Sequence, residues 1–191
     1  MSRRGAYIAG LGVAVIVPVV AAAFSPLLQY RSPIYIGAGF AGILAMSALL
    51  IQPFAIDHKS LGIPLRRGRL LHRIVGAAVV ALVMAHVAGL WITSPPDVVD
   101  ALTFRSPTPF SIWGVLAMWA VFGSAVLGLL RLRGRIRWRM FRLLHLACVA
   151  VIVGGTLLHV ILIDGTMEPV TKYAICVALA VASIWGVRRI G

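Results

Sequence analysis

The chain has 191 residues, of which 61% are hydrophobic and only 12% are charged. A charged fraction about half that of an average soluble domain excludes an ordinary soluble globular protein and predicts an integral membrane protein. The net charge of +13 suggests nucleic-acid binding, but the cations gather in short segments between apolar runs. That distribution is typical of the cytoplasmic loops of membrane proteins, so no nucleic-acid partner is expected.

Six apolar segments are long enough to cross a hydrocarbon core of about 30 Å as helices of roughly 20 residues. In chain order they are residues 6–24, 34–56, 70–93, 110–130, 143–163 and 170–187. The predicted fold class is therefore all-α: a polytopic membrane helical bundle of six transmembrane helices, with residues 1–191 forming a single domain.

The first segment also has features of a cleavable signal peptide. Arg3 and Arg4 precede the apolar run, and small residues at 21–23 follow it. However, the run is long for a signal peptide and another span follows at once. We therefore expect an uncleaved helix; cleavage would leave the orientation of the other five spans unchanged.

The distribution of cations predicts the orientation. With the N-terminus inside, 15 of the 18 Lys and Arg residues fall on the cytoplasmic side, and only Arg31, Arg105 and Lys172 fall outside. This asymmetry predicts that both termini are cytoplasmic. We expect a multi-pass protein of the plasma membrane, the inner membrane of a bacterium.

Four histidines lie inside the third and fifth apolar segments with a repeated spacing. His72 and His86 form a His-x13-His pattern, and His145 and His159 form the same pattern further along the chain. Polar side chains in hydrocarbon are costly and usually mark function. Over this spacing a helix rises about 21 Å and turns only about 40° short of four full turns. Both histidines of a helix therefore face nearly the same way, one near each membrane surface.

The predicted topology makes these two helices parallel, which pairs the histidines by depth. His72 lies with His145 near the cytoplasmic surface, and His86 lies with His159 near the outer surface. Two neutral imidazoles form a low-spin, electron-transferring iron centre with no open coordination site. The four residues are thus candidate metal ligands for two stacked b-type haems. A lone membrane histidine more often forms a hydrogen bond between helices, but four at equal spacings favour haem.

The sequence Arg-Leu-Leu-His precedes the inner histidine of both helices, with Arg69 before His72 and Arg142 before His145. An arginine three positions earlier lies on the same helix face, one turn nearer the cytoplasm. Arg69 and Arg142 are candidate cofactor-binding residues, because each can neutralise a haem propionate through a charge-assisted hydrogen bond. The alternative, that both only follow the positive-inside rule, has equal weight.

Two connecting segments are candidate contact surfaces. Residues 131–142 hold six arginines; this stretch could dock an acidic donor such as a flavoprotein, although contact with anionic lipid is the favoured interpretation. Residues 94–109 form the longest outer segment and are the best candidate surface for an acceptor. His58, in the loop after the second span, is interpreted as solvated.

With six spans, a His-x13-His spacing in the third and fifth, and two Arg-Leu-Leu-His openings, the chain resembles the ferric reductase-like transmembrane domain superfamily. It is similar to the haem-binding membrane subunit of the periplasmic methionine sulfoxide reductase system. The resemblance implies axial haem ligation by the four histidines. It also implies electron transport from a cytoplasmic reductant to an extracytoplasmic acceptor.

The chain ends at Gly191, directly after the sixth segment, and carries no Gly-rich dinucleotide fingerprint. We therefore expect the membrane component of an oxidoreductase without its own flavin or nicotinamide domain, and no catalytic side chains of its own. Its donor would be a separate flavoprotein, a quinol, or FMN or FAD bound at the cytoplasmic face. The acceptor would be an extracytoplasmic protein or small molecule.

Two alternative functions remain open. One is a quinol-oxidising cytochrome b-type subunit, which uses the same histidine spacing. The other is a non-redox membrane protein whose histidines only pack or bind a metal.

Overall fold

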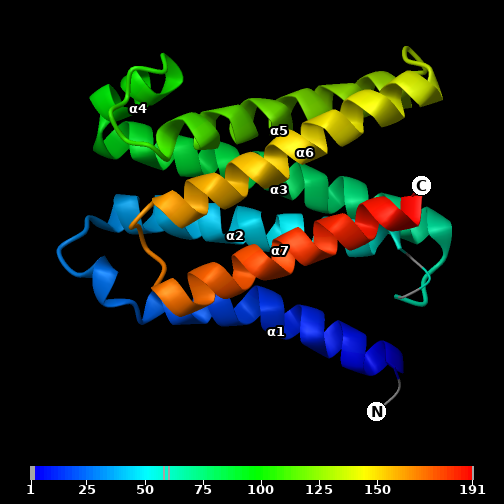
Figure 1. Ribbon diagram of the computed structural model, residues 1–191, viewed down its shortest axis with the longest axis horizontal. Helices are drawn as coiled ribbons and strands as arrows, with labels where there is room; N and C mark the ends of the chain where they lie inside the picture. Colours follow the sequence, from blue (N-terminus) through cyan, green and yellow to red (C-terminus); the bar gives the residue numbers. More distant parts are fainter. Residues whose placement is uncertain (1–2, 58, 60, 191) are drawn as a thin grey trace. The chain divides into compact units, whose positions relative to one another are not determined.

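The computed structural model describes residues 3–57, 59 and 61–190, and all regular structure in them is helical, which confirms the all-α class (Figure 1). The chain divides into two compact units, Met1–Thr93 with Asp164–Gly191, and Ser94–Ile163. The first unit contains α1 (Arg3–Ala23), the 3-10 helix η1 (Pro26–Leu28), α2 (Pro33–Ile56), α3 (Leu65–Thr93) and α7 (Pro169–Ile190). The second unit contains α4 (Pro95–Leu102), α5 (Ser111–Leu132) and α6 (Trp138–Leu162).

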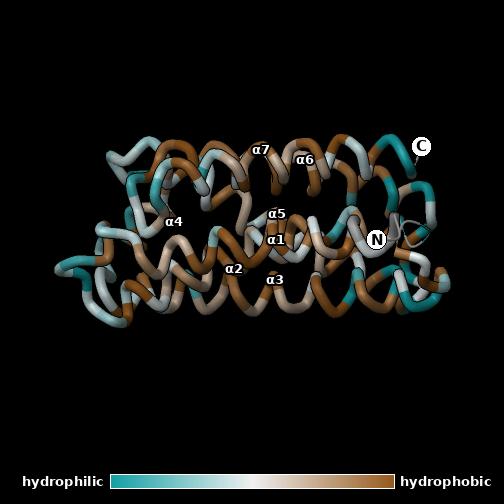
Figure 2. Tube along the Cα trace, turned by 90° about the horizontal axis from the view of Figure 1, so that it is seen from below, coloured by the Kyte–Doolittle hydropathy of each residue, from teal (hydrophilic) through white to brown (hydrophobic). Residues whose placement is uncertain are grey.

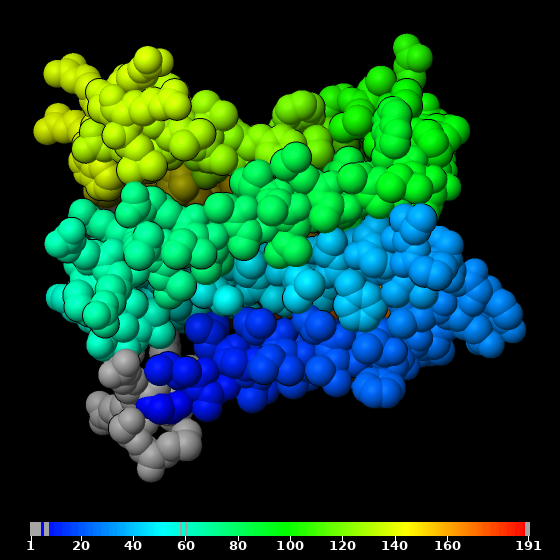
Figure 3. All heavy atoms as spheres, turned by 180° about the vertical axis from the view of Figure 1, so that it is seen from behind, coloured from blue at the N-terminus to red at the C-terminus, as the bar shows by residue number. Residues whose placement is uncertain are grey.

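In the first unit, α2 is the central helix and packs against α1, α3 and α7. Figure 3 shows it in cyan between α1 in blue and α3 in teal and green. Ala38, Ala41 and Ala45 are among its buried residues. Small side chains let neighbouring helices approach closely in a membrane, where lipid is as apolar as the helix surface. As a result, the backbone of α2 lies within reach of side chains on α3.

Side-chain caps fix where two helices of this unit begin. Ser32 Oγ accepts the N–H of Tyr35 at 3.2 Å, and Pro33 occupies the first helical position of α2. At α7, the Glu168 carboxylate accepts the N–H groups of Val170 and Thr171, both at 2.6 Å. The Thr171 side chain and these N–H groups hold the pKa of Glu168 below its ordinary value, because they stabilise its ionised form.

The second unit is built on the antiparallel hairpin of α5 and α6, with α4 packed on α5 (Figure 1). The turn between α5 and α6 contains Gly134 at φ +68°, a left-handed conformation that favours glycine. The N–H of Arg135 donates to the carbonyl of Leu130 at 2.9 Å, and the N–H of Gly134 donates to that of Arg131 at 3.1 Å. This Schellman motif ends α5 and reverses the chain within a short turn, so that α6 returns along α5.

Five helices, α2, α3, α5, α6 and α7, are long and apolar enough to cross a membrane, which confirms an integral membrane protein. Figure 2 shows hydrophobic residues along the middle of the helices and hydrophilic residues at their ends and in the loops. The apolar part of α1 among the described residues, Ile8–Ala23, is shorter, so the sixth span stays a prediction. The start of α1 and the end of α7 lie at the same end of the first unit (Figure 1); their cytoplasmic location also stays a prediction.

Two helix starts and one connecting segment differ most from the sequence prediction. The helices α3 and α6 begin at Leu65 and Trp138, earlier than residues 70 and 143. The residues added at these starts include Arg66, Arg67 and Arg69 in α3 and Arg139 and Arg142 in α6. Arginine is polar and so interrupts an apolar run, yet it is a good helix former. The outer segment contains a helix, α4, where a loop was expected. His58 lies outside the described residues.

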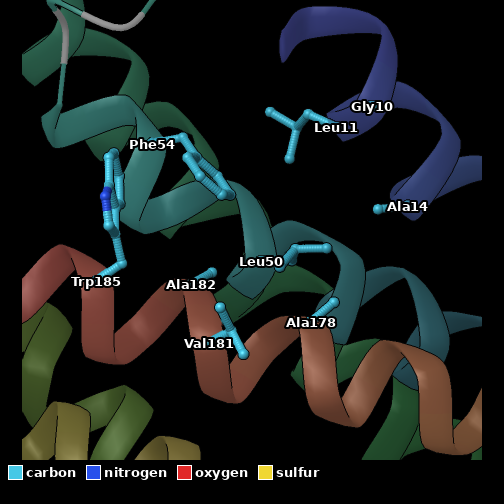
Figure 4. A pocket seen from close by; sticks show the side chains of 9 residues that line it. All are labelled: Gly10, Leu11, Ala14, Leu50, Phe54, Ala178, Val181, Ala182 and Trp185. Carbon is cyan, nitrogen blue, oxygen red and sulfur yellow. The ribbon is translucent and has the colours of Figure 1, made fainter. Parts of the chain in front are cut away.

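An apolar cavity of about 350 Å³ lies between α1, α2 and α7 of the first unit (Figure 4). Trp185 lines it, with its ring centroid 5.5 Å from that of Phe54, and the guanidinium carbon of Arg189 is 5.2 Å from the centroid of the Trp185 ring. Its lining residues are Gly10, Leu11, Ala14, Leu50, Phe54, Ala178, Val181, Ala182 and Trp185. The four histidines of the candidate site are not among them.

Candidate functional site

His86, on α3, is anchored to the backbone of α2. Its Nδ1 lies 2.7 Å from the carbonyl oxygen of Ala38, and the residue is half-buried. A carbonyl oxygen can only accept, so Nδ1 carries the proton and donates it. In the neutral imidazole the lone pair is then on Nε2, the nitrogen through which this tautomer can ligate a metal.

A glycine makes this contact possible. A helical carbonyl points toward the residue four positions later, so the side chain at that position borders the approach to it. Four positions after Ala38 stands Gly42, and a Cβ placed there would be 3.1 Å from His86 Nδ1. The absence of a side chain lets the imidazole reach the backbone.

His72, near the start of α3, also turns Nδ1 toward α2. The atom lies 3.4 Å from the carbonyl oxygen of Gln52, and the residue is half-buried. The Gln52 side-chain amide reaches the same turn of α3: oriented to satisfy its neighbours, its nitrogen donates to His72 Nδ1 at 2.5 Å and its oxygen accepts the N–H of Gly76 at 2.9 Å. Both histidines of the first unit are therefore held by α2.

In the second unit, His159 on α6 repeats the arrangement of His86. Its Nδ1 donates to the carbonyl of Phe110 at 3.0 Å, and the same oxygen accepts the N–H of Gly114 at 3.2 Å. A Cβ at Gly114 would be only 2.7 Å from His159 Nδ1. The Phe110 ring meets the imidazole edge-on, with centroids 5.7 Å apart. Carbonyl, glycine and ring together fix the direction of His159.

His145 has a different kind of support. Its Nδ1 lies 3.0 Å from the hydroxyl oxygen of Ser124 on α5. Phe141, one turn earlier on α6, stacks on the imidazole, with centroids 5.2 Å apart and planes inclined by 16°. This is the one histidine of the four for which the structure gives a side-chain hydroxyl as the Nδ1 partner.

The residues that anchor the histidines were not predicted, but a repeat in the sequence identifies them. Phe110 follows Ala38 by the same interval at which Ser124 follows Gln52. Between them, Gly-Ile-Leu-Ala-Met at 42–46 recurs as Gly-Val-Leu-Ala-Met at 114–118. The helices α2 and α5 are thus equivalent supports, each placed before a helix that carries two histidines.

The two arginines that are candidates for binding haem propionates lie one turn before the inner histidines, as the sequence predicts. Arg69 is exposed on α3 one turn before His72, and Arg142 is half-buried on α6 one turn before His145. Their contact with a haem propionate stays a prediction. In the basic turn between α5 and α6, Arg131 donates from Nη1 to the Ile136 carbonyl at 3.1 Å, and its guanidinium carbon lies 5.6 Å from the centroid of the Trp138 ring.

The structure brings each histidine together with its support inside one unit. The pairing of His72 with His145, and of His86 with His159, would join the two units and stays a prediction. Within each unit, however, the chemistry fits axial haem ligands. Such ligands bind iron through one ring nitrogen and donate from the other to a carbonyl or another acceptor, which fixes the tautomer and the ring orientation.

The family model described as ferric reductase like transmembrane component matches residues 38–156. The chain belongs to this family. The match begins at Ala38, the carbonyl partner of His86, includes His72, His86 and His145, and ends shortly before His159. Comparison with curated proteins and with solved structures found no match. Membership of the ferric reductase-like family indicates a membrane domain that takes part in transmembrane electron transfer, works with separate redox partners and is associated with haem and flavin.

Proposed function

We propose that this ferric reductase-like chain conducts electrons across the membrane through two b-type haems, each held by two histidines. His72 and His145 would ligate the haem near the cytoplasmic surface, and His86 and His159 the haem near the outer surface. The proposal rests on one observation above all: each of the four Nδ1 atoms lies within hydrogen-bond distance of a polar group on, or at the start of, the preceding long helix of its own unit.

That observation separates the proposal from a purely structural role for the histidines. A histidine that only joins helices can use either ring nitrogen, and its neighbours need not recur. Here the outer histidine of each unit reaches a backbone carbonyl past a glycine at the same position of the repeat. This arrangement fixes the orientation of the His86 and His159 rings, and so the direction of each Nε2, relative to their helices. Two ligands of one iron require such fixed directions.

Bound haem would supply a one-electron couple between Fe(III) and Fe(II), while the protein supplies position, a low dielectric and axial ligation. His86 and His159 would donate their Nδ1 protons to carbonyls, which raises the basicity of Nε2 toward the metal. Arg69 and Arg142 would neutralise propionates of the inner haem. The apolar spans would keep water away from the conducting path.

The proposed direction of electron transfer is from the cytoplasm outward. One electron is received at the inner side for each electron that is delivered outside. The cytoplasmic donor would be a flavoprotein, bound FMN or FAD, or a quinol. The basic turn at 131–142, which includes the exposed Trp138 and the arginines around it, is a surface suited to an acidic donor. The outer acceptor would meet the segment that contains α4.

A vesicle assay tests this function. Purified protein is reconstituted into liposomes that contain trapped ferricyanide, and dithionite, which does not cross the bilayer, is added outside. We expect ferricyanide to be reduced much faster than in protein-free liposomes, because two haems in series bridge a core of about 30 Å. Replacing any one of the four histidines by alanine should return the rate to that of protein-free liposomes.

His58→Ala is the matched control and should leave the rate unchanged. Wild-type vesicles no faster than protein-free vesicles would contradict the proposed function. Purified protein without a reducible b-type absorbance spectrum would favour the non-redox alternative. Rapid reduction of that spectrum by a quinol, with none by reduced flavin or a flavoprotein, would favour the quinol-oxidising alternative.

A further inference from the structure

The four histidines are not supported alike. His86 and His159 turn Nδ1 toward backbone carbonyls, at 2.7 and 3.0 Å. His72 Nδ1 faces both the carbonyl of Gln52 at 3.4 Å and its side-chain amide at 2.5 Å, and His145 Nδ1 faces the hydroxyl of Ser124 at 3.0 Å. Both histidines of the proposed inner pair therefore have a side-chain partner, an amide at His72 and a hydroxyl at His145. A hydroxyl differs from a carbonyl both in acceptor strength and in its ability to donate.

The local geometry explains why a side chain performs this role. At Ala38 and Phe110 the glycine four positions later lets the imidazole reach the backbone. At Ser124 the hydroxyl projects from α5 and meets the ring of His145 outside the helix. Four positions further on, Gly128 has no atom within 4 Å of an added Cβ, so the ring does not approach α5 there.

The direction of this hydrogen bond has a consequence for metal binding. If the Ser124 hydroxyl donated to Nδ1, the proton of the neutral imidazole would be on Nε2, and that nitrogen could not ligate iron. If Ser124 accepts, Nδ1 keeps the proton and Nε2 offers its lone pair. Phe141, stacked on the ring, limits its rotation and so keeps Nδ1 directed at Ser124.

We infer that Ser124 is a positioning residue for the inner haem: by accepting the Nδ1 proton of His145, it fixes the ligating tautomer and sets the midpoint potential of that haem. This inference rests on the proposed function, since it concerns a haem ligand. A partner that accepts more strongly gives the imidazole more anionic character, which stabilises Fe(III) and lowers the potential. A hydroxyl accepts less strongly than a carbonyl, so the serine keeps the inner haem easier to reduce.

Potentiometric titration of the purified haem-loaded protein tests this. Two one-electron waves are expected in the wild type, and the inner haem is the one lost in His145→Ala. In Ser124→Ala the inner wave should move to higher potential, with a reduced-to-oxidised ratio at fixed potential up to about tenfold higher, equivalent to ~59 mV for one electron. In Ser124→Asn, whose amide carbonyl is a stronger acceptor, it should move lower.

Ser124→Thr keeps the hydroxyl and should restore the wild-type inner wave. Ser47→Ala is the matched control, because Ser47 is a fully buried serine of α2, and both waves should stay in place. The outer wave should not move in any of these variants. Loss of the inner haem in Ser124→Ala, with its retention in Ser124→Thr, would also support the inference.

The inference is overturned if Ser124→Ala leaves the inner wave unchanged, if both waves shift together, or if the threonine variant behaves like the alanine variant. A wild-type protein that binds no haem would instead reject the proposed function itself. The low-spin signals in the electron paramagnetic resonance spectrum give a second readout, because they report the ligand field of the inner haem separately from electron transport.

Discussion

At the scale of single residues, the histidines stand out because of how they are held. A neutral hydrogen bond contributes only about 0.5–1.5 kcal/mol to stability, but an unpaired polar group in an apolar medium costs more. The carbonyl partners of His86 and His159 therefore do little for folding beyond removing that cost. Their larger effect is to fix the ring orientation before any ligand arrives, which lowers the entropic cost of binding.

The two arginines before the inner histidines give a prediction at this scale. In Arg69→Gln or Arg142→Gln, we expect the inner haem to bind more weakly, by about 1.5–3 kcal/mol, the usual contribution of a hydrogen bond to a charged group. Its midpoint potential should also fall, because a positive charge that favours Fe(II) has been removed. Haem retention on dilution and potentiometric titration measure the two effects.

Arg73→Gln is the control for charge alone. Arg73 is adjacent to His72 but lies about 100° away around the helix, and its side chain is exposed. If this variant weakens the inner haem as much as Arg69→Gln does, the arginines only contribute to the cytoplasmic surface charge, and the propionate role is wrong.

At the scale of elements, the same two-helix support occurs twice. The helices α2 and α3 form one support and α5 and α6 the other, each within its own unit. The recurrence of Gly-x-Leu-Ala-Met in α2 and α5 places Gly42 and Gly114 at matching positions. Both glycines serve the contact of the outer histidine with the preceding helix, so we expect substitutions there to act on the outer haem.

Gly114→Ala should disturb this contact most. The new Cβ would be 2.7 Å from Nδ1 and 2.9 Å from Cε1 of His159, so the ring or α6 must shift. Overpacking of this kind costs about 1–3 kcal/mol. Gly42→Ala should have a smaller effect, because its Cβ would be 3.1 Å from His86 Nδ1. Thermal unfolding in detergent and the haem content of the purified variants measure the difference.

Gly128→Ala, also on α5, provides the matched control. An added Cβ there meets no atom within 4 Å, and alanine is the better helix former, so neither stability nor haem content should fall. Equal losses in the two α5 variants would show that the effect comes from glycine in a membrane helix in general, and not from the approach of His159.

At the scale of the whole molecule, the sequence predicted what depends on composition and periodicity. Hydropathy identified the five helices that the structure shows to be long and apolar enough to cross a membrane. The histidine spacing identified the two helices that carry the candidate ligands. Both features are visible in a sequence because they are properties of side chains that recur along a helix.

The features that the sequence did not predict depend on backbone groups or on polar residues at the ends of helices. The acceptors at Ala38 and Phe110 are carbonyl groups, which every residue has, so their residue types do not identify them. The helical starts of α3 and α6 were missed because arginines such as Arg66 and Arg139 interrupt the apolar run there, although arginine is a good helix former. The helix α4 begins at Pro95 and has only 8 residues. Proline is common both in loops and at the first position of a helix, so this short segment suggests a loop as readily as a helix.

The most direct test of the account is the haem content of the purified protein and of its four single histidine variants, measured per chain together with the reduced spectrum. The account predicts two haems per chain in the wild type. His72→Ala and His145→Ala should lose the same haem, and His86→Ala and His159→Ala should lose the other. One haem or none in the wild type, or His86→Ala and His145→Ala lacking the same haem, would contradict it.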